Sequence, residues 1–225
     1  MSDPPIVLEM SGLPARSGTE PVRRTPAHRL HAGLGARFDR LDGWEIPAAY
    51  GPVDLERAAI RGGLAIADVT PRGKIDLRGA VDEMLARLAP GPEVRVARLS
   101  ARSALILTRP SDVAPWLAAA EQAAGVSGMA TDVTCVYAGI ALLGPNAWDL
   151  LARLTSMDVS TVGPGGATGL RLAKVPAILV RGEYAIEVYA ASESGRYLWQ
   201  TVAETAGRLQ GRAVGWDALT AEGWR

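Results

Sequence analysis

The sequence predicts an α+β fold in which helices pack on mixed or antiparallel sheets. Segments with strand alternation and segments with helical spacing are interleaved, but several helices lead into adjacent pairs of strands instead of strict β-α-β units. No long linker divides the hydrophobic segments. Of the 225 residues 48% are hydrophobic, which is enough for one large domain or two small, closely packed ones.

The first third of the sequence predicts a tail, two helices and a short apolar strand. Residues 1–24 are rich in Pro, Ser, Gly and Arg, a composition that predicts a mobile tail. Thr-Pro at a helix start, Gly at a helix end and apolar residues at helical spacing mark the helices. The expected elements are a helix from Thr25 to Gly33 or Gly35, a turn at Asp42–Glu45, a helix over Val53–Arg61 and an apolar run over Leu64–Val69.

The middle third alternates between strands and helices. Arg residues alternating with apolar ones predict a strand with two different faces, and Ser-Asp before an Ala-rich stretch predicts a capped helix. The expected elements are strands over Lys74–Leu77, Val94–Leu99 and Ser103–Thr108, and helices over Val81–Leu88 and from Ser111-Asp112 to Ala124. If residues 25–225 form two subdomains, their boundary is expected near residues 125–132.

The last third predicts a long strand, a hairpin and two helices. The Gly-rich loop at 163–169 lacks a phosphate-binding motif, since it holds no Lys-Ser/Thr pair and no G-x-G-x-x-G. The expected elements are a strand over Asp132–Leu143, a helix over Asn146–Leu154, a hairpin of Leu170–Val180 and Tyr184–Tyr189, and a helix from Ser192 or Ser194 to Arg208.

Composition excludes several classes of function. Net charge is zero and both signs are mixed along the chain, so we expect no nucleic-acid partner. The single Cys135 predicts no disulfide framework, and two nearby His residues with no Cys or acidic cluster predict no metal site. Without an apolar run of about 20 residues or a signal peptide, we expect a cytoplasmic protein with no membrane span.

Five motifs resemble those of the aminomethyltransferases, the T-protein family of the glycine cleavage system. They are Thr25-Pro26-Ala27-His28, Gly43-Trp44-Glu45-Ile46-Pro47, the segment Ile66–Ile75, the segment Ala141–Ala147 and the segment Glu183–Tyr189. The second half is also similar to the small gamma subunit of heterotetrameric sarcosine oxidases, which shares the folate-binding domain. The implied fold is a folate-binding domain without the family's C-terminal barrel domain.

The resemblance implies a tetrahydrofolate site between closely packed subdomains, with no metal. The residue matching the family's pterin-binding carboxylate is Glu187. One carboxylate can accept two N–H donors from a pterin edge, whereas the alternative is an outward polar residue on an alternating strand. Asp68, inside an apolar run, is either a second pocket residue or a carboxylate that accepts local backbone N–H bonds. We expect Trp44 to pack near the pocket.

The departures from the family pattern concern catalysis. The family's catalytic aspartate lies in a segment that matches Arg95–Leu107, which contains no acid. The family's His-Met is replaced by Pro71-Arg72, and its late Arg-Asp-x-Leu-Arg by Trp216-Asp217-Ala218-Leu219-Thr220. Losing a positioned acid or base typically costs about 10²–10⁴ in rate. The chain also stops where the family's third domain would begin, so we expect a partner to close the folate hole.

These observations leave three hypotheses, and the catalytic residues are unknown. The first is a tetrahydrofolate-binding subunit for one-carbon transfer, working with an amine-demethylating oxidoreductase or with a second copy of itself. The second is an inactive structural subunit that no longer binds folate. The third is a stand-alone transferase that uses another acid, such as Asp68 or Asp132.

Overall fold

The computed structural model describes residues 21–91, 94–183 and 185–224. Its α-helices are α1 (His28–Gly33), α2 (Val53–Gly62), α3 (Val81–Leu88), α4 (Val113–Ala124), α5 (Ala147–Leu154), α6 (Ser192–Arg208) and α7 (Trp216–Ala221). Short 3₁₀ turns are η1 (Pro110–Asp112) and η2 (Val159–Thr161). Its strands are β1 (Arg23–Arg24), β2 (Arg37–Leu41), β3 (Trp44–Ala49), β4 (Ala65–Asp68), β5 (Gly73–Gly79), β6 (Arg95–Ser100), β7 (Ser103–Thr108), β8 (Gly128–Asp132), β9 (Tyr137–Leu143), β10 (Ala167–Leu172), β11 (Val175–Arg181), β12 (Ala185–Ala191) and β13 (Arg212–Ala213).

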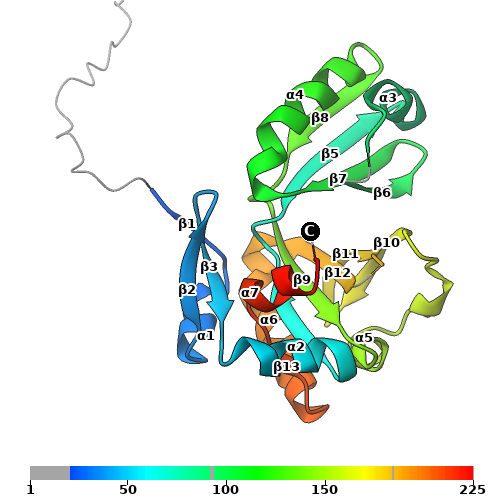
Figure 1. Ribbon diagram of the computed structural model, residues 1–225. Helices are drawn as coiled ribbons and strands as arrows, with labels where there is room; N and C mark the ends of the chain where they lie inside the picture. The colour runs from blue at the N-terminus through cyan, green and yellow to red at the C-terminus, as the bar shows by residue number, and fades with distance from the viewer. Residues whose placement is uncertain (1–20, 92–93, 184, 225) are drawn as a thin grey trace, which may run out of the picture.

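The strands of the described residues pair into three sheets. The largest has the order β10-β11-β12-β9-β4-β13 and packs against α5 and α6. The second has the order β6-β7-β5-β8 and carries α3 and α4 on one face, and the third has the order β1-β3-β2. Figure 1 shows the second sheet above the largest one and β1 to β3 on the left. In this view α7 lies between β3 and β9. The predicted α+β class with mixed and antiparallel sheets is confirmed.

The second sheet is an insertion between β4 and β9 of the largest sheet. Its strands and helices run from Gly73 to Asp132, and β4 then pairs antiparallel with β9 across this insertion. The subdomain boundary near residues 125–132 stays a prediction, and those residues include β8, the last strand of the insertion. The predicted tail lies outside the described residues as far as residue 20, whereas Arg23–Arg24 pair in parallel with β3.

The predicted helices are present within a few residues of their expected bounds, and two predicted strands are wrong. The expected strand over Asp132–Leu143 is two strands, because Asp132 ends β8 on one sheet and β9 starts on another at Tyr137. The expected strand over Leu170–Val180 is a hairpin, because Ala173 and Lys174 have φ values of 48° and 71° and form a tight turn. Neither residue is a usual turn former, so no local signal marks this turn.

Candidate functional site

Glu187 lies on β12, in the interior of the largest sheet. Its neighbours across the sheet are Val180 on β11 and Ala141 on β9. The exposed fraction of its side chain is 0%, so it is not the outward polar residue that strand alternation allowed. Burying a carboxylate costs several kcal/mol unless it is paired and hydrogen-bonded. The partners of Glu187 therefore decide what it can bind.

Two arginines and a tyrosine hold the Glu187 carboxylate. Arg72 Nη1 and Arg95 Nη1 both donate to Oε1, at 3.2 Å and 2.6 Å, and the Tyr189 hydroxyl donates to Oε2. Burial, followed by the charge of Glu187, raises the pKa of Tyr189 well above its ordinary value, which keeps the hydroxyl protonated. We call these four residues the Glu187 cluster. Its carboxylate is neutralised from within the protein.

Two glycines make room for this arrangement. A Cβ added at Gly182 would lie 2.6 Å from Arg95 Nη1 and 2.9 Å from the Ala185 carbonyl oxygen. A Cβ added at Gly139 would lie 2.8 Å from the Tyr189 ring. Real Cβ contacts are almost never that close, so a side chain at either position would displace a partner of Glu187. The cluster therefore depends on small residues on two neighbouring segments.

Arg72 also lines a cavity of about 390 Å³, which we call the Arg72 cavity. The other lining residues are Leu41, Asp42, Thr108, Arg109, Pro110, Ser111, Trp216, Thr220 and Trp224. The cavity thus lies where the end of β7 and η1 face α7, near the C-terminal end of the ribbon in Figure 1. The Trp216 and Trp224 rings meet edge to face at 5.3 Å, and the Arg72 guanidinium lies 4.9 Å from the Trp224 ring centroid. Glu187 itself does not line the cavity.

Lys74 lies beside the Glu187 cluster and is fully buried. Its Nζ donates to the carbonyl oxygens of Thr70 and Arg72 at 2.8 Å and 2.6 Å, and lies 5.6 Å from the centroid of the Tyr189 ring. Burial lowers the pKa of Lys74 to about 7. These bonds fix the backbone that carries Arg72, so Lys74 positions the arginine.

Asp68 ends β4 and belongs to a second buried network. Its Oδ2 lies 2.7 Å from His31 Nε2, its Oδ1 accepts the Thr70 N–H at 2.9 Å, and the Tyr50 hydroxyl lies 2.7 Å from His31 Nδ1. Burial alone would raise the pKa of Asp68, but the hydrogen bond and charge of His31, with Thr70, hold it below its ordinary value. We call Asp68, His31 and Tyr50 the Asp68 relay. Asp68 therefore accepts a local backbone N–H, as one of the two sequence hypotheses expected.

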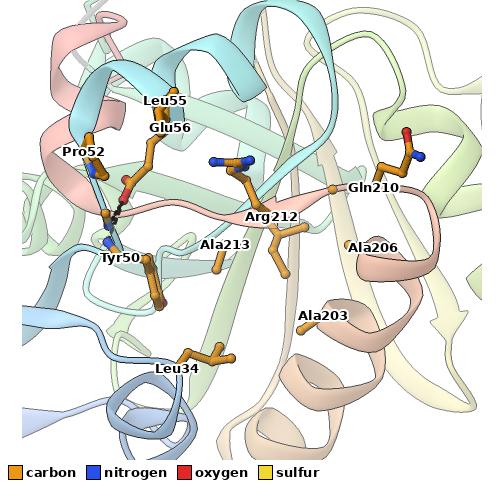
Figure 2. A pocket seen from close by; sticks show the side chains of 13 residues that line it. Leu34, Tyr50, Pro52, Leu55, Glu56, Ala203, Ala206, Gln210, Arg212 and Ala213 are labelled. Atoms are coloured by element: carbon orange, nitrogen blue, oxygen red, sulfur yellow. Dashed lines mark hydrogen bonds between the residues drawn. The ribbon is translucent and has the colours of Figure 1, made fainter.

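Tyr50 borders a second cavity, of about 420 Å³ (Figure 2). Most of its wall is apolar, from Leu34, Pro52, Leu55 and the alanines of α6 and β13. Glu56 lies at its edge but is already engaged, because its carboxylate accepts the backbone N–H groups of Tyr50, Gly51 and Gly215. The Asp68 relay thus connects this cavity to the core, whereas the Glu187 cluster adjoins the Arg72 cavity.

Trp44 is 3% exposed and packs in the same hydrophobic cluster as Trp216 and Trp224, while the Arg23 guanidinium lies 5.1 Å from its ring centroid. It does not line the Arg72 cavity.

In the described part of the chain, no three His, Cys, Asp or Glu residues gather as metal ligands would. None of the helices in that part combines the length and apolar character that a membrane span requires.

Comparison with known proteins identifies the family. The GCVT N-terminal domain family matches residues 92–222, more than half of the chain. This chain belongs to that family. It is 29% identical over 212 residues to an aminomethyltransferase of Saccharopolyspora erythraea and 28% identical over 227 residues to one of Symbiobacterium thermophilum. The alignments cover 81% and 85% of this chain but 58% and 60% of those proteins, so the chain spans about three-fifths of their length.

Two solved structures share the GCVT-family fold. Aminomethyltransferase T of the glycine cleavage system from Bartonella henselae aligns with a TM-score of 0.73 at 18% identity, over 88% of this chain and 60% of that one. A chain of heterotetrameric sarcosine oxidase from Corynebacterium sp. U-96 aligns with a TM-score of 0.61 at 18% identity, over 83% of this chain and 96% of that one. The resemblance noted from the sequence motifs is confirmed.

Three of the positions at which the sequence resemblance indicated departures lie together. Arg72, Trp216 and Thr220 all line the Arg72 cavity. Sequence reasoning identified these positions singly but missed Arg95 and Tyr189. The available signal was charge: a buried acid on β12 needs cations, and β6 carries Arg95 in a segment without acids.

Proposed function

We propose that this chain is a GCVT-family subunit that does not hold a pterin on Glu187 and supports the one-carbon chemistry of a partner protein. The observation that carries this proposal is the state of Glu187, whose two carboxylate oxygens already accept from Arg72, Arg95 and Tyr189. The partner in this proposal is an amine-demethylating oxidoreductase.

The chemistry of a pterin edge supports this proposal. That edge presents N–H donors, which need the free lone pairs of a carboxylate. Here the same lone pairs accept from fixed donors, and Arg72 is only 3% exposed. Separating one partner from a buried ion pair costs about 3–5 kcal/mol, a large part of the roughly −8 kcal/mol of a micromolar ligand. The acid-free Arg95–Leu107 segment adds that no carboxylate stands ready there to assist transfer.

The subunit role draws support from the sarcosine oxidase comparison. The aligned region covers 96% of a chain from a heterotetrameric enzyme, so a protein of this fold and extent can act as one part of a larger assembly. A stand-alone transferase that uses Asp68 or Asp132 as its acid has less support. Asp68 is 2% exposed and bound to His31, and Asp132 accepts the Thr134 N–H at 2.8 Å.

A second candidate function is tetrahydrofolate binding with Arg72 withdrawn from Glu187. It is favoured by the Arg72 cavity, whose size falls within the roughly 300–1,000 Å³ of small-molecule sites. In this case the pterin would replace Arg72 and Arg95 as the donor to Glu187, and the two arginines would have to turn toward other acceptors.

Calorimetric titration of the purified chain with 5-formyl-tetrahydrofolate separates the two candidates. The proposed function expects no binding near the micromolar range for the natural chain or for Glu187→Gln. Micromolar binding that Glu187→Gln removes would overturn it in favour of the second candidate. For the subunit role, co-purification from the native host should recover an oxidoreductase, whereas one-carbon transfer by the chain alone would contradict it.

A further inference from the structure

We propose that the Arg72 cavity binds a small organic anion, a monocarboxylate with an aromatic or apolar body. The inference rests on the proposed function only in taking Glu187 as occupied by its arginines. It concerns Arg72 as a residue that lines the cavity.

Two side chains that line this cavity each carry a buried donor without a partner. Arg72 Nε and Trp224 Nε1 are buried side-chain nitrogens that have no hydrogen-bond partner among the described residues. Both side chains line the cavity, and the exposed fractions of these two residues are 3% and 9%. An unsatisfied buried donor costs about 1–3 kcal/mol, more when it is charged. An acceptor placed in the cavity near both residues would remove that cost.

The charge balance around Arg72 favours an anionic acceptor. In the Glu187 cluster two guanidinium groups share one carboxylate, and they do so through the same oxygen, Oε1. Tyr189 is neutral, so the cluster carries one positive charge in excess. Buried charge without a partner is costly, and a carboxylate against Arg72 would compensate it. Of the other charged lining residues, Arg109 pairs with Asp112, and Asp42 is exposed.

The remaining wall defines the body of the ligand. Trp216 and Trp224 present their rings edge to face, and Leu41 and Pro110 add apolar surface. The Trp216 Nε1 is already used, because it donates to the Asp68 carbonyl oxygen at 2.9 Å. Trp216 therefore offers only its ring to a ligand. Thr220 carries no charge and Arg109 is paired with Asp112, so Arg72 is the cation that suits the cavity to one carboxylate.

Calorimetry with 2-naphthoate and its neutral isostere 2-naphthamide tests this inference on the purified chain. We expect 2-naphthoate to bind at least tenfold more tightly than the amide. Trp224→Phe removes the N–H and keeps an aromatic ring. This variant should bind 2-naphthoate about tenfold more weakly, as expected for the loss of one hydrogen bond to a charged group. Trp148→Phe is the matched control, since Trp148 does not line the cavity and packs against a different hydrophobic cluster, and the affinity of this variant for 2-naphthoate should be unchanged.

Equal affinity for acid and amide, no binding of the acid at millimolar concentration to folded protein, or an unchanged affinity in Trp224→Phe would each overturn the inference. Arg72→Lys gives a second readout, because it keeps the charge and removes the guanidinium N–H groups. This variant should also bind 2-naphthoate more weakly. These results are independent of the folate titration, since neither tryptophan variant touches Glu187. Folate binding that depends on Glu187 would refute the proposed function alone.

Discussion

The Glu187 cluster and the Asp68 relay are two solutions to the same problem, a carboxylate buried in the core. Glu187 is held by two arginines and a tyrosine, whereas Asp68 is held by a histidine and one backbone N–H. The arginine side chain is a cation that only donates hydrogen bonds, whereas an imidazole ring has two nitrogens that can each contact a different partner. The first carboxylate is thus bound to two cations, and the second to a ring whose other nitrogen contacts the Tyr50 hydroxyl.

This difference shows that burial and motif position alone do not make a binding residue. Glu187 was expected from a motif resemblance to bind a pterin, but both of its carboxylate oxygens already accept hydrogen bonds from Arg72, Arg95 and Tyr189. The group that faces the Arg72 cavity is instead Arg72, a donor. A cavity whose polar wall changes from acceptor to donor selects a different class of ligand. The following predictions test whether the two carboxylates differ as their partners imply.

The largest expected effect is that of Glu187→Gln on stability. The change leaves Arg72 and Arg95 without an anionic partner, and breaking a buried pair in this way costs about 3–5 kcal/mol. Urea unfolding of both proteins at pH 7 measures the loss. Glu83→Gln is a suitable control, because Glu83 pairs with Arg87 on the surface of α3 and should cost less than about 1 kcal/mol. A Glu187→Gln protein as stable as the natural one would mean that the arginines do not need this carboxylate.

The next effect is a rise in stability with pH that comes from Lys74. Burial lowers the pKa of this lysine to about 7, below its ordinary value of 10.5. Between these two values the unfolded chain binds a proton that the folded chain does not, so stability rises with pH by at most about 1.4 kcal/mol per unit. In Lys74→Met, the urea midpoint of unfolding should depend less on pH between pH 7 and 10 than in the natural chain. An unchanged slope in the variant would show that Lys74 stays charged in the folded state.

Most of the fold could be predicted because local signals agreed with the final structure. The predicted helix over Val81–Leu88 has the bounds of α3, and the predicted strand over Ser103–Thr108 has those of β7. The prediction was wrong where tertiary context decided. The segment Asp132–Leu143 is mostly apolar and was predicted as one strand, but between Asp132 and Tyr137 the chain passes from the second sheet to the largest one. Periodicity does not show to which sheet a strand belongs.

The site was harder to predict because its partners are far apart in sequence. Glu187 meets Arg72 and Arg95, which lie 115 and 92 residues away, and no spacing rule connects them. The same holds for Asp68 and His31, which lie 37 residues apart. In the structure His31 is buried against Asp68, whereas His28 pairs with Glu45 near the surface. Sequence reasoning found the acids and missed the cations.

Asp68→Asn is expected to cost about 1–3 kcal/mol at pH 7, because the charged hydrogen bond to His31 is lost. The folded-state pKa of Asp68 lies below its ordinary value of 3.8, so its contribution is present above that value and disappears as pH falls through the folded pKa. The stability difference between the two proteins should therefore shrink in acid. Urea unfolding from pH 7 down to about 3 measures it. A difference that stays constant would indicate a packing effect and not a charged bond.

An effect of the same size as that of Asp68→Asn is expected at Gly182, whose missing side chain lets Arg95 reach Glu187. Gly182→Ala brings a Cβ to 2.6 Å from Arg95 Nη1 and 2.9 Å from the Ala185 carbonyl oxygen, so the structure must shift at a cost of about 1–3 kcal/mol. Gly169→Ala is the matched control, since a Cβ there meets no atom within 4 Å. Combining Gly182→Ala with Glu187→Gln sharpens the test. If Gly182 acts through the cluster, the two losses will be less than additive, because the second change removes a contact that the first has already weakened. Additive losses would place the role of Gly182 in the turn between β11 and β12.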